Sequence, residues 1–287
     1  MNKPHIEHIH IAGAAGAPMR RLSEVTALKG LGLAGDRYWA RAGFWQDNRV
    51  SRDLTLIEGE SIDRIANELG AQLDAGETRR NITTRGIDLN GLVGTTFWIG
   101  EVLAMGANLC EPCRHLVELT GRPLLRPMVH RGGLRADLLS SGRLREGDPI
   151  DVVELQPGVG VIVMQGDRVL IGKRLAAHGF GTWSFPGGKP LIGESNEECA
   201  IRELSEETGL TGASPRVVGT TLDGFKESRV AFRTTFVVIP VVQGELKALE
   251  PQKTSAWSWL AWRSLPTPLF APVASLVASG YDPIHDR

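Results

Sequence analysis

The second half of the chain places apolar stretches and turn residues in a pattern that predicts strands and two helices. Residues 159–164 and 168–174 flank Gly166-Asp167, a dipeptide that tolerates the positive φ of a tight turn, so they predict a hairpin. Residues 195–208 repeat apolar positions at helical spacing and keep their glutamates on other faces. The remaining elements expected in this half are strands at residues 231–242 and 256–262 and a terminal helix at residues 270–279.

The first half is rich in short strand-like runs that glycines interrupt. Residues 54–57 and 95–105 are the clearest of these runs, and residues 60–69 show one helical pattern. A strand is expected at residues 148–153, after which Gln156-Pro157-Gly158 predicts a break. We therefore expect two domains with almost no linker. They are a strand-dominated mixed α/β domain at residues 1–156 and a second domain at residues 157–287.

Composition limits the classes of partner. With 32 basic and 33 acidic residues the net charge is -1, so the whole chain offers no field that would gather nucleic acid or anionic lipid. No apolar run approaches the roughly 20 residues of a membrane-spanning helix. Three cysteines are too few for a disulfide framework. We expect a small-molecule partner, no nucleic acid or membrane partner, and a cytoplasmic, reducing setting, while the sequence leaves the oligomeric state open.

One motif in the second half carries specific chemistry. Gly188 is followed by five residues, Glu194, seven further residues and the run Arg202-Glu203-Leu204-Ser205-Glu206-Glu207-Thr208-Gly209-Leu210. Because residues three and four positions apart share a helix face, Glu203, Glu206 and Glu207 bring three repelling carboxylates together. Carboxylates without a nearby His or Cys ligand suit a hard cation such as Mg²⁺ or Mn²⁺. The motif therefore predicts a divalent metal site.

These residues fill every fixed position of the box G-x5-E-x7-R-E-U-x-E-E-x-G-U, with U apolar, so the second half resembles the Nudix hydrolases. The resemblance implies an α/β/α sandwich and metal-dependent hydrolysis of a phosphoanhydride. It assigns the metal ligands to the three helix glutamates and the Gly188 carbonyl, and the activation of water to one glutamate or a neighbour. Arg202 belongs to this catalytic cluster, where we expect it to pair with Glu194 and fix the helix. The alternatives are a solvated acidic helix face and a Nudix scaffold reused for binding alone.

Residues outside the box narrow the substrate class. Residues 220–236 contain neither the Pro nor the Tyr that ADP-ribose and dinucleoside-polyphosphate enzymes respectively tend to place downstream. Residues 181–188, 250–253 and 257–259 resemble the nucleoside-triphosphate branch, which includes enzymes that clear oxidised or otherwise modified nucleotides. We therefore expect a nucleoside triphosphate or a related nucleoside diphosphate derivative. Aromatic side chains that could stack on its base, or simply pack in the core, are Trp183, Phe185, Phe225 and Trp257.

A series of short motifs runs through residues 11–153. They are Gly35-Asp36-Arg37-Tyr38, Leu54-Thr55-Leu56-Ile57-Glu58, Arg80-Asn81-Ile82, Gly100-Glu101-Val102, Cys110-Glu111-Pro112-Cys113, His130-Arg131-Gly132-Gly133-Leu134 and Gly147-Asp148. In this order they resemble the MOSC family, the domain found at the C-terminal end of molybdenum cofactor sulfurases and also alone in bacteria. The resemblance implies a barrel-like domain that binds molybdenum cofactor or carries sulfur.

Cys110 and Cys113 form the candidate site of the first half. In the MOSC family a cysteine is thought to bind molybdenum or carry sulfur, and Cys113 is the best positional match, with Cys110 as its rival. The pair could instead be half of a zinc site, a redox pair or two buried small residues. The polar residues expected around the phosphate of a pterin cofactor are Arg37, Arg80, Asn81 and Arg131.

Two functional hypotheses follow. The first is metal-dependent hydrolysis of a nucleotide by the second half, with the first half binding molybdenum cofactor or carrying sulfur. The second places the function in the first half, as a cofactor-binding, sulfur-carrying or reductase protein whose second half only recognises a nucleotide. The intact glutamate cluster favours the first hypothesis.

Overall fold

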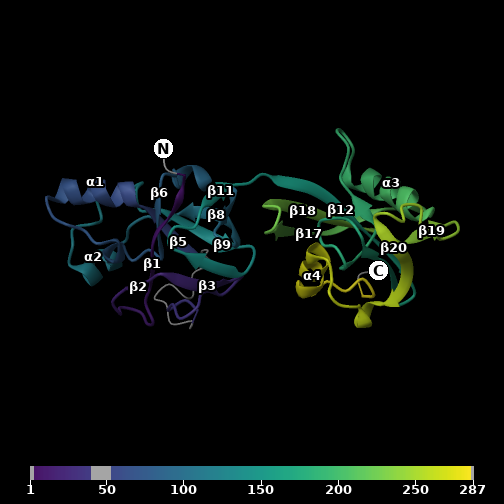
Figure 1. The fold of residues 1–287 in the computed structure, drawn as a ribbon, viewed down its shortest axis with the longest axis horizontal. Coiled ribbons are helices and arrows are strands. Elements are labelled where there is room, and N and C mark those ends of the chain that lie inside the picture. The colour runs from purple at the N-terminus through teal and green to yellow at the C-terminus, as the bar shows by residue number, and fades with distance from the viewer. Residues whose placement is uncertain (1–2, 40–52, 286–287) are drawn as a thin grey trace. The chain divides into compact units, whose positions relative to one another are not determined.

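A computed structural model describes residues 3–39 and 53–285 of the protein (Figure 1). The described chain separates into two compact units, with the main division between Glu154 and Leu155. The sequence predicted the domain boundary after residue 156, two residues beyond this division, and that boundary stays a prediction. None of the described helices is long and apolar enough to cross a membrane.

The first unit is built on a sheet that curls into a half barrel (Figure 1). Its strand order is β11 (Ile150–Val152), β7 (Thr96–Ile99), β8 (Val102–Leu109), β9 (Leu134–Leu138), β5 (Leu54–Glu58), β6 (Ile82–Arg85), β1 (His5–Ile11) and β2 (Arg20–Leu22). Neighbours are antiparallel except for β5 and β6. A smaller sheet has the order β10 (Gly142–Arg145), β3 (Glu24–Leu28) and β4 (Gly32–Leu33).

Short helices cover one side of this sheet. Helix α1 (Gly59–Leu69) and helix α2 (Arg114–Thr120) pack through Ile62, Ile65 and Leu116 into one apolar cluster. The predicted helix at residues 60–69 is confirmed as α1, and the predicted strand run at 95–105 is the two strands β7 and β8. The chain turns between those strands at Gly100, whose φ of 53° suits glycine. The remaining short helices of this unit are the 3-10 turns η1 (Ala75–Thr78) and η2 (Asn90–Leu92).

The second unit contains a mixed sheet. Its strand order is β14 (Trp183–Ser184), β13 (Arg168–Arg174), β12 (Leu155–Gln165), β18 (Val230–Ile239) and β17 (Arg216–Phe225), with β15 (Gly187–Gly188) beside β12 and β20 (Thr254–Ala261) beside β13. Strands β12 and β18 are parallel, whereas β12 and β13 form the predicted antiparallel hairpin. Strands β16 (Thr211–Ala213) and β19 (Val241–Gln243) pair separately, and η3 (Trp262–Ser264) follows β20.

Alternation along β12 explains the layers of this unit. Val159 and Val161 lie in the apolar cluster of helix α3 (Asn196–Thr208), whereas Ile162 lies in the cluster of helix α4 (Ala271–Ala278). Because neighbouring side chains of a strand point to opposite faces, the two helices cover opposite faces of the sheet. The expected α/β/α sandwich is therefore confirmed, as are the helices predicted at residues 195–208 and 270–279.

Two expectations for this unit were wrong or incomplete. Gln156-Pro157-Gly158 is not a break, because β12 begins at Leu155 and pairs with β18 through these residues. Strand β15 joins β12 only at Val159 and Gly160, so one edge of β12 is open at Pro157 and tolerates a residue without an amide hydrogen. Strand β17 lies where no strand was expected.

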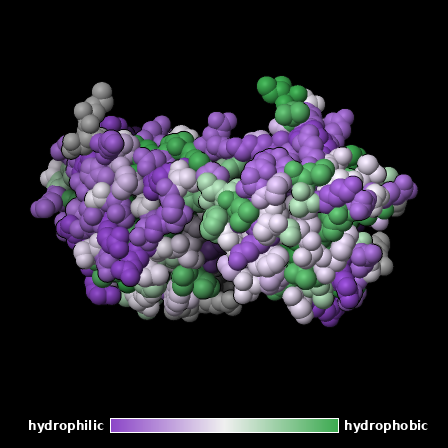
Figure 2. All heavy atoms as spheres, turned by 45° about the vertical axis from the view of Figure 1, so that its right-hand side comes forward, coloured by the Kyte–Doolittle hydropathy of each residue, from purple (hydrophilic) through white to green (hydrophobic). Residues whose placement is uncertain are grey.

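The surface seen in Figure 2 is largely hydrophilic, with apolar residues scattered over it. The most exposed large apolar side chains of the second unit include Phe180, Leu191 and Ile192. Leu191 and Ile192 are adjacent in the loop before α3, whereas Phe180 is a single exposed apolar residue of the kind that is normal for a protein surface.

Candidate active site

Helix α3 is fixed at both ends by capping residues, Ser195 and Gly209. Ser195 caps its start, because the Ser195 hydroxyl accepts from the Glu198 amide at 3.2 Å and the Glu198 carboxylate accepts from the Ser195 amide at 2.9 Å. Gly209 ends the helix in the left-handed region, with φ of 71°. The cap and the glycine set the helical register that places Glu203 and Glu207.

The inner glutamates face the glycine pair of β15. Glu203 and Glu207 are both buried. The Gly187 amide donates to Glu207 Oε2 at 3.1 Å, and a Cβ at Gly188 would lie 2.2 Å from Glu203 Oε1. The absence of a side chain at Gly188 therefore lets the backbone approach the carboxylate.

Arg202 ties the helix to the loop before it. Its guanidinium donates to both carboxylate oxygens of Glu194, at 2.7 and 2.9 Å, and to the Lys189 carbonyl at 3.1 Å. This pairing holds the pKa of Glu194 down at about 2. Arg202 Nη1 also lies 2.7 Å from Glu203 Oε1 and 3.0 Å from Glu206 Oε2. The expected Arg202–Glu194 ion pair is thus present, and Arg202 additionally neutralises two of the glutamates.

Glu207 has no comparable partner. Burial raises its pKa to about 7, against the lowering effect of the Gly187 amide, and the charges of Glu203 and Glu250 raise it further. Glu206, by contrast, is exposed. A cation at Glu207 would offset the cost of burying its charge.

The carboxylate oxygens of the α3 glutamates are suitable ligands for a hard cation, although these side chains do not converge on a single metal position. Among residues 3–39 and 53–285, no three His, Cys, Asp or Glu side chains lie close enough to hold a metal ion as they stand. Arg202 engages the Glu203 and Glu206 carboxylates that were predicted to be ligands. Arg202 contacts one oxygen of each carboxylate, so Glu203 Oε2 and Glu206 Oε1 are the oxygens that could bind Mg²⁺ or Mn²⁺.

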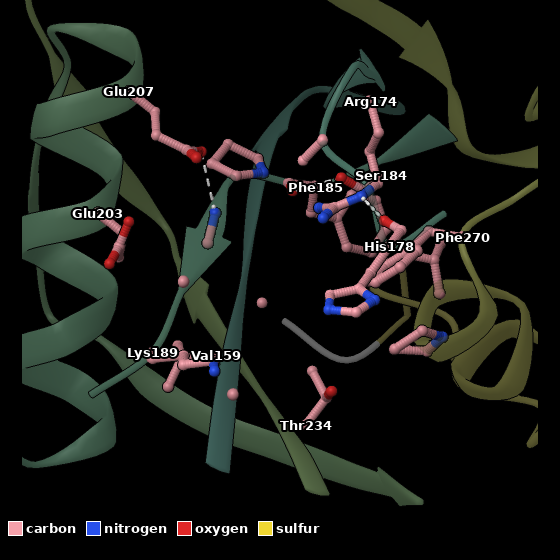
Figure 3. A pocket seen from close by; sticks show the side chains of 18 of the residues that line it. Val159, Arg174, His178, Ser184, Phe185, Lys189, Glu203, Glu207, Thr234 and Phe270 are labelled. Atoms are coloured by element: carbon pink, nitrogen blue, oxygen red, sulfur yellow. Dashed lines mark hydrogen bonds between the residues drawn. The ribbon is translucent and has the colours of Figure 1, made fainter. Parts of the chain in front are cut away.

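A cavity of about 340 Å³ opens beside these glutamates (Figure 3). Glu203 and Glu207 point into one side of it from α3, and Arg174, His178 and Phe270 gather on the opposite side. The further cationic and aromatic side chains that line the cavity are Lys189, Lys253, Phe185, Phe232 and Phe236. This volume and mixed lining are typical of a small-molecule site.

The predicted base-stacking residues divide between the cavity and its surroundings. Phe185 lines the cavity. Trp183, Phe225 and Trp257 do not belong to its described lining. Trp183 packs in the core beside α4, and the Trp257 indole donates to the Glu207 carbonyl at 3.1 Å, which supports the end of α3. Direct base contact by the four aromatic residues stays a prediction.

Sequence reasoning missed several residues that line the cavity. Lys189 directly follows the glycine pair, and this position was the signal that could have identified it. Arg174 and His178 belong to no motif, and Lys253 lies in a stretch that resembled the nucleoside-triphosphate branch but was given no role in the site. Pairing of β13 with β14 and β20 brings these segments of the chain together. Lys253 lies 2.8 Å from Glu250, so Glu250 supports the site indirectly.

The cysteine pocket of the first unit brings together part of the predicted set. Cys110, Cys113, Arg37 and Arg80 line a pocket of about 80 Å³. Cys110 is buried, whereas Cys113 is half-buried. Polar residues that line this pocket without having been assigned to it are Tyr38, Thr55, Arg79, Glu111, His115 and Arg135.

Most of the residues that were predicted to bind the phosphate of a cofactor form hydrogen bonds or ion pairs within the protein instead. Arg80 donates to the carbonyls of Gly132, Thr78 and Cys110. The Asn81 amide donates to the His10 carbonyl and to Asp36. The structure does not place Asn81 or Arg131 in the pocket lining, and Arg131 pairs with Glu68. The sequence alone could not tell which of Arg37, Arg80, Asn81 and Arg131 would reach a ligand. The burial and the backbone partners of each side chain depend on the fold.

A larger cavity adjoins the pocket that contains the two thiols. A second cavity of about 590 Å³ shares Gly16, Arg79 and Leu119 with it. The described lining of this second cavity contains Arg79 and no cysteine, so it offers room for a small molecule next to the thiol pocket.

Family models match both halves of the chain. A NUDIX domain model matches residues 154–279, which include the box and the cavity, and a MOSC domain model matches residues 44–151, which include both cysteines. The chain carries a MOSC domain followed by a Nudix domain. Of the motifs that suggested the MOSC domain, Gly35 to Tyr38 precede the matched residues.

Solved structures similar to this chain include two Nudix proteins. A MutT Nudix hydrolase from Burkholderia pseudomallei is 26% identical, covers 44% of this chain and 95% of its own, and has a TM-score of 0.41. The Nudix domain of Shewanella oneidensis NrtR, solved with ADP ribose, is 17% identical, covers 44% and 87%, and has a TM-score of 0.37. The YUAD protein from Bacillus subtilis is 18% identical, covers 53% and 96%, and has a TM-score of 0.45.

Proposed function

We propose that the Nudix domain hydrolyses a phosphoanhydride in a nucleoside triphosphate or a related nucleoside diphosphate derivative. Nudix-family membership supports pyrophosphohydrolase action on nucleotide derivatives. The observation that carries the finer proposal is the two-sided cavity, with buried Glu203 and Glu207 on one side and aromatic side chains on the other. Such a cavity suits a ligand that is anionic at one end and planar at the other.

Different residues of the cavity would bind the phosphates and the metal ion. Lys189 and Lys253 supply positive charge for phosphate oxygens close to the glutamates. Glu203, Glu206, Glu207 and the Gly188 carbonyl would hold Mg²⁺ or Mn²⁺, which when bound neutralises phosphate charge and makes a bound water more acidic. Hydrolysis adds one water across the phosphoanhydride, breaks one P–O bond and leaves two phosphate-containing products. Arg202 would keep α3 and its loop in place.

The test is a panel of nucleotides incubated with the full-length protein and Mg²⁺ or Mn²⁺, with phosphate and pyrophosphate release measured. We expect release that stops when a chelator removes the metal. Binding of nucleotides without release of either product would support the rival function, in which the Nudix domain only recognises a nucleotide.

We also propose that the cysteine pocket of the MOSC domain holds molybdenum cofactor, with Cys113 as the thiol closest to solvent of the pair. The thiolate is the metal-binding form of cysteine, and Arg79 and Arg135 line the pocket and offer positive charge to an anionic ligand, whereas Arg37 is paired with Asp36. When bound, the cofactor would supply oxygen-atom or electron-transfer chemistry. Reconstitution with the cofactor followed by metal analysis tests this role, and no retained molybdenum would contradict it.

A further inference from the structure

His10 is buried beneath the 3-10 turn that ends at Arg79. It lies on β1, and its side chain points away from the apolar core to which its two neighbours in the strand belong. The residue is only 8% exposed. A Cβ at Gly76 would lie 3.3 Å from His10 Cδ2, so η1 rests directly on the imidazole ring. His10 and Gly76 both line the cavity of about 590 Å³ that adjoins the thiol pocket of Cys110 and Cys113.

The buried imidazole has no partner that would stabilise its charged form. Among residues 3–39 and 53–285, His10 Nδ1 is buried and has no hydrogen-bond partner. The centroid of the His8 ring lies 6.2 Å away, and Arg21 stands opposite His10 in the neighbouring strand β2. Burial, and then the positive charges of His8 and Arg21, lower the pKa of His10 below its ordinary value of 6.5. His10 is therefore mostly neutral at neutral pH.

The carboxylates near His10 already have partners. The charged or titratable residues that line the cavity or act on His10 are His8, Arg21, Asp74, Glu77, Arg79 and Glu146. Glu146 accepts from Arg21 at 2.8 and 3.0 Å, and Glu77 pairs with Arg122 at 3.0 Å. The Asp74 carboxylate caps η1 by accepting from the Glu77 amide. A proton added to His10 would create a buried charge, and each carboxylate would have to leave its present partner to neutralise it.

The turn η1 connects His10 to the wall of the thiol pocket. The Arg79 amide donates to the Gly76 carbonyl at 3.1 Å and closes the turn. The Arg79 guanidinium donates to the Ala17 carbonyl, and Arg79 lines both the thiol pocket and the larger cavity. A displacement of η1 away from β1 would therefore move Arg79 and change access to the half-buried Cys113.

We propose that His10 is a pH-sensitive switch of the MOSC domain: when the imidazole takes up a proton, η1 separates from β1 and opens the wall of the thiol pocket at Arg79. The open form lets the imidazolium reach water, which removes the cost of burying its charge. Because the folded state binds this proton less readily than the unfolded state, the stabilisation from neutral His10 is present above about pH 6.5 and is lost as the pH falls through the lowered pKa. The switch would operate with or without a bound cofactor.

Hydrogen–deuterium exchange of the full-length protein measures the opening of η1. After correction for the intrinsic pH dependence of exchange, the opening equilibrium of the Glu77 and Arg79 amides should rise several-fold between about pH 7.5 and about pH 5.5. His10→Phe, which fills the site without a titratable group, should remove this rise. The control is His5→Gln, which removes another imidazole of β1 outside the cavity lining and should keep the rise.

His8→Gln tests the same switch without changing the buried ring. Loss of this neighbouring positive charge should move the midpoint of opening to higher pH. Modification of Cys113 by a disulfide reagent that reacts at acidic pH, followed by mass spectrometry, should speed up over the same pH range when wild type is compared with His10→Phe. Opening that does not depend on pH, a rise that persists in His10→Phe, an unchanged midpoint in His8→Gln or unchanged relative reactivity of Cys113 would each overturn the proposal.

Discussion

At the scale of single residues, the folded Nudix domain makes ionisation of the Glu207 carboxyl group unfavourable. Its carboxylate is buried against Gly187 and close to Glu203, so folding favours the protonated form and raises its pKa to about 7. The stabilisation from this group is fully present below about pH 4.5, the ordinary value, and is lost as the pH rises through about 7. Ionised Glu207 therefore destabilises the metal-free protein at alkaline pH.

We predict that Glu207→Gln stabilises the metal-free protein at pH 8, by up to about 3 kcal/mol, because glutamine removes a buried charge and still accepts from the Gly187 amide. The gain should shrink towards zero near pH 5. Chemical unfolding in the presence of a chelator measures both values. A glutamine variant that is less stable than wild type at pH 8 would contradict the assignment of a buried, uncompensated charge.

At the scale of elements, α3 places the site because its ends are fixed. The helix and the β12–β13 hairpin follow from local signals, namely the Ser195 cap, the Gly209 end and the turn at Gly166. The strand start at Leu155 and the cavity residues Arg174 and Lys253 depend instead on pairing between distant strands, which local pattern does not encode. The sequence could therefore indicate the glutamates, and it could not assign the cavity residues that distant strands bring to them.

We predict that Ser195→Ala costs about 1 kcal/mol of unfolding free energy, because the Glu198 amide loses its acceptor at the helix start. Ser195→Asp should retain most of the stability. Ser205→Ala, at an exposed position inside the same helix, is the matched control and should cost nothing. Equal stability of the two alanine variants in urea would argue against the capping role.

At the scale of the whole molecule, the two domains have separate cores. The apolar clusters of the MOSC domain and those of the Nudix domain share no residue. Domains with separate cores can carry independent sites.

We predict that Cys113→Ser abolishes binding of molybdenum cofactor and leaves nucleotide hydrolysis unchanged. Cys110→Ser should matter less for cofactor binding, because its side chain is buried. Retained molybdenum and nucleotide turnover are measured on the same preparations. Equal loss of cofactor from both variants would indicate a paired thiol site, and loss of hydrolysis would show that the domains are coupled.

The central claim is that the α3 glutamates support metal-dependent hydrolysis, and the most direct measurement is nucleotide turnover at saturating Mg²⁺ in matched variants. We predict that Glu203→Gln and Glu207→Gln each lower turnover by at least about 100-fold while the protein stays folded, since each removes charge from the metal site. Glu197→Gln, which removes a carboxylate from the first turn of the same helix, is the control and should keep wild-type turnover. Near wild-type turnover in Glu203→Gln or Glu207→Gln would contradict the account.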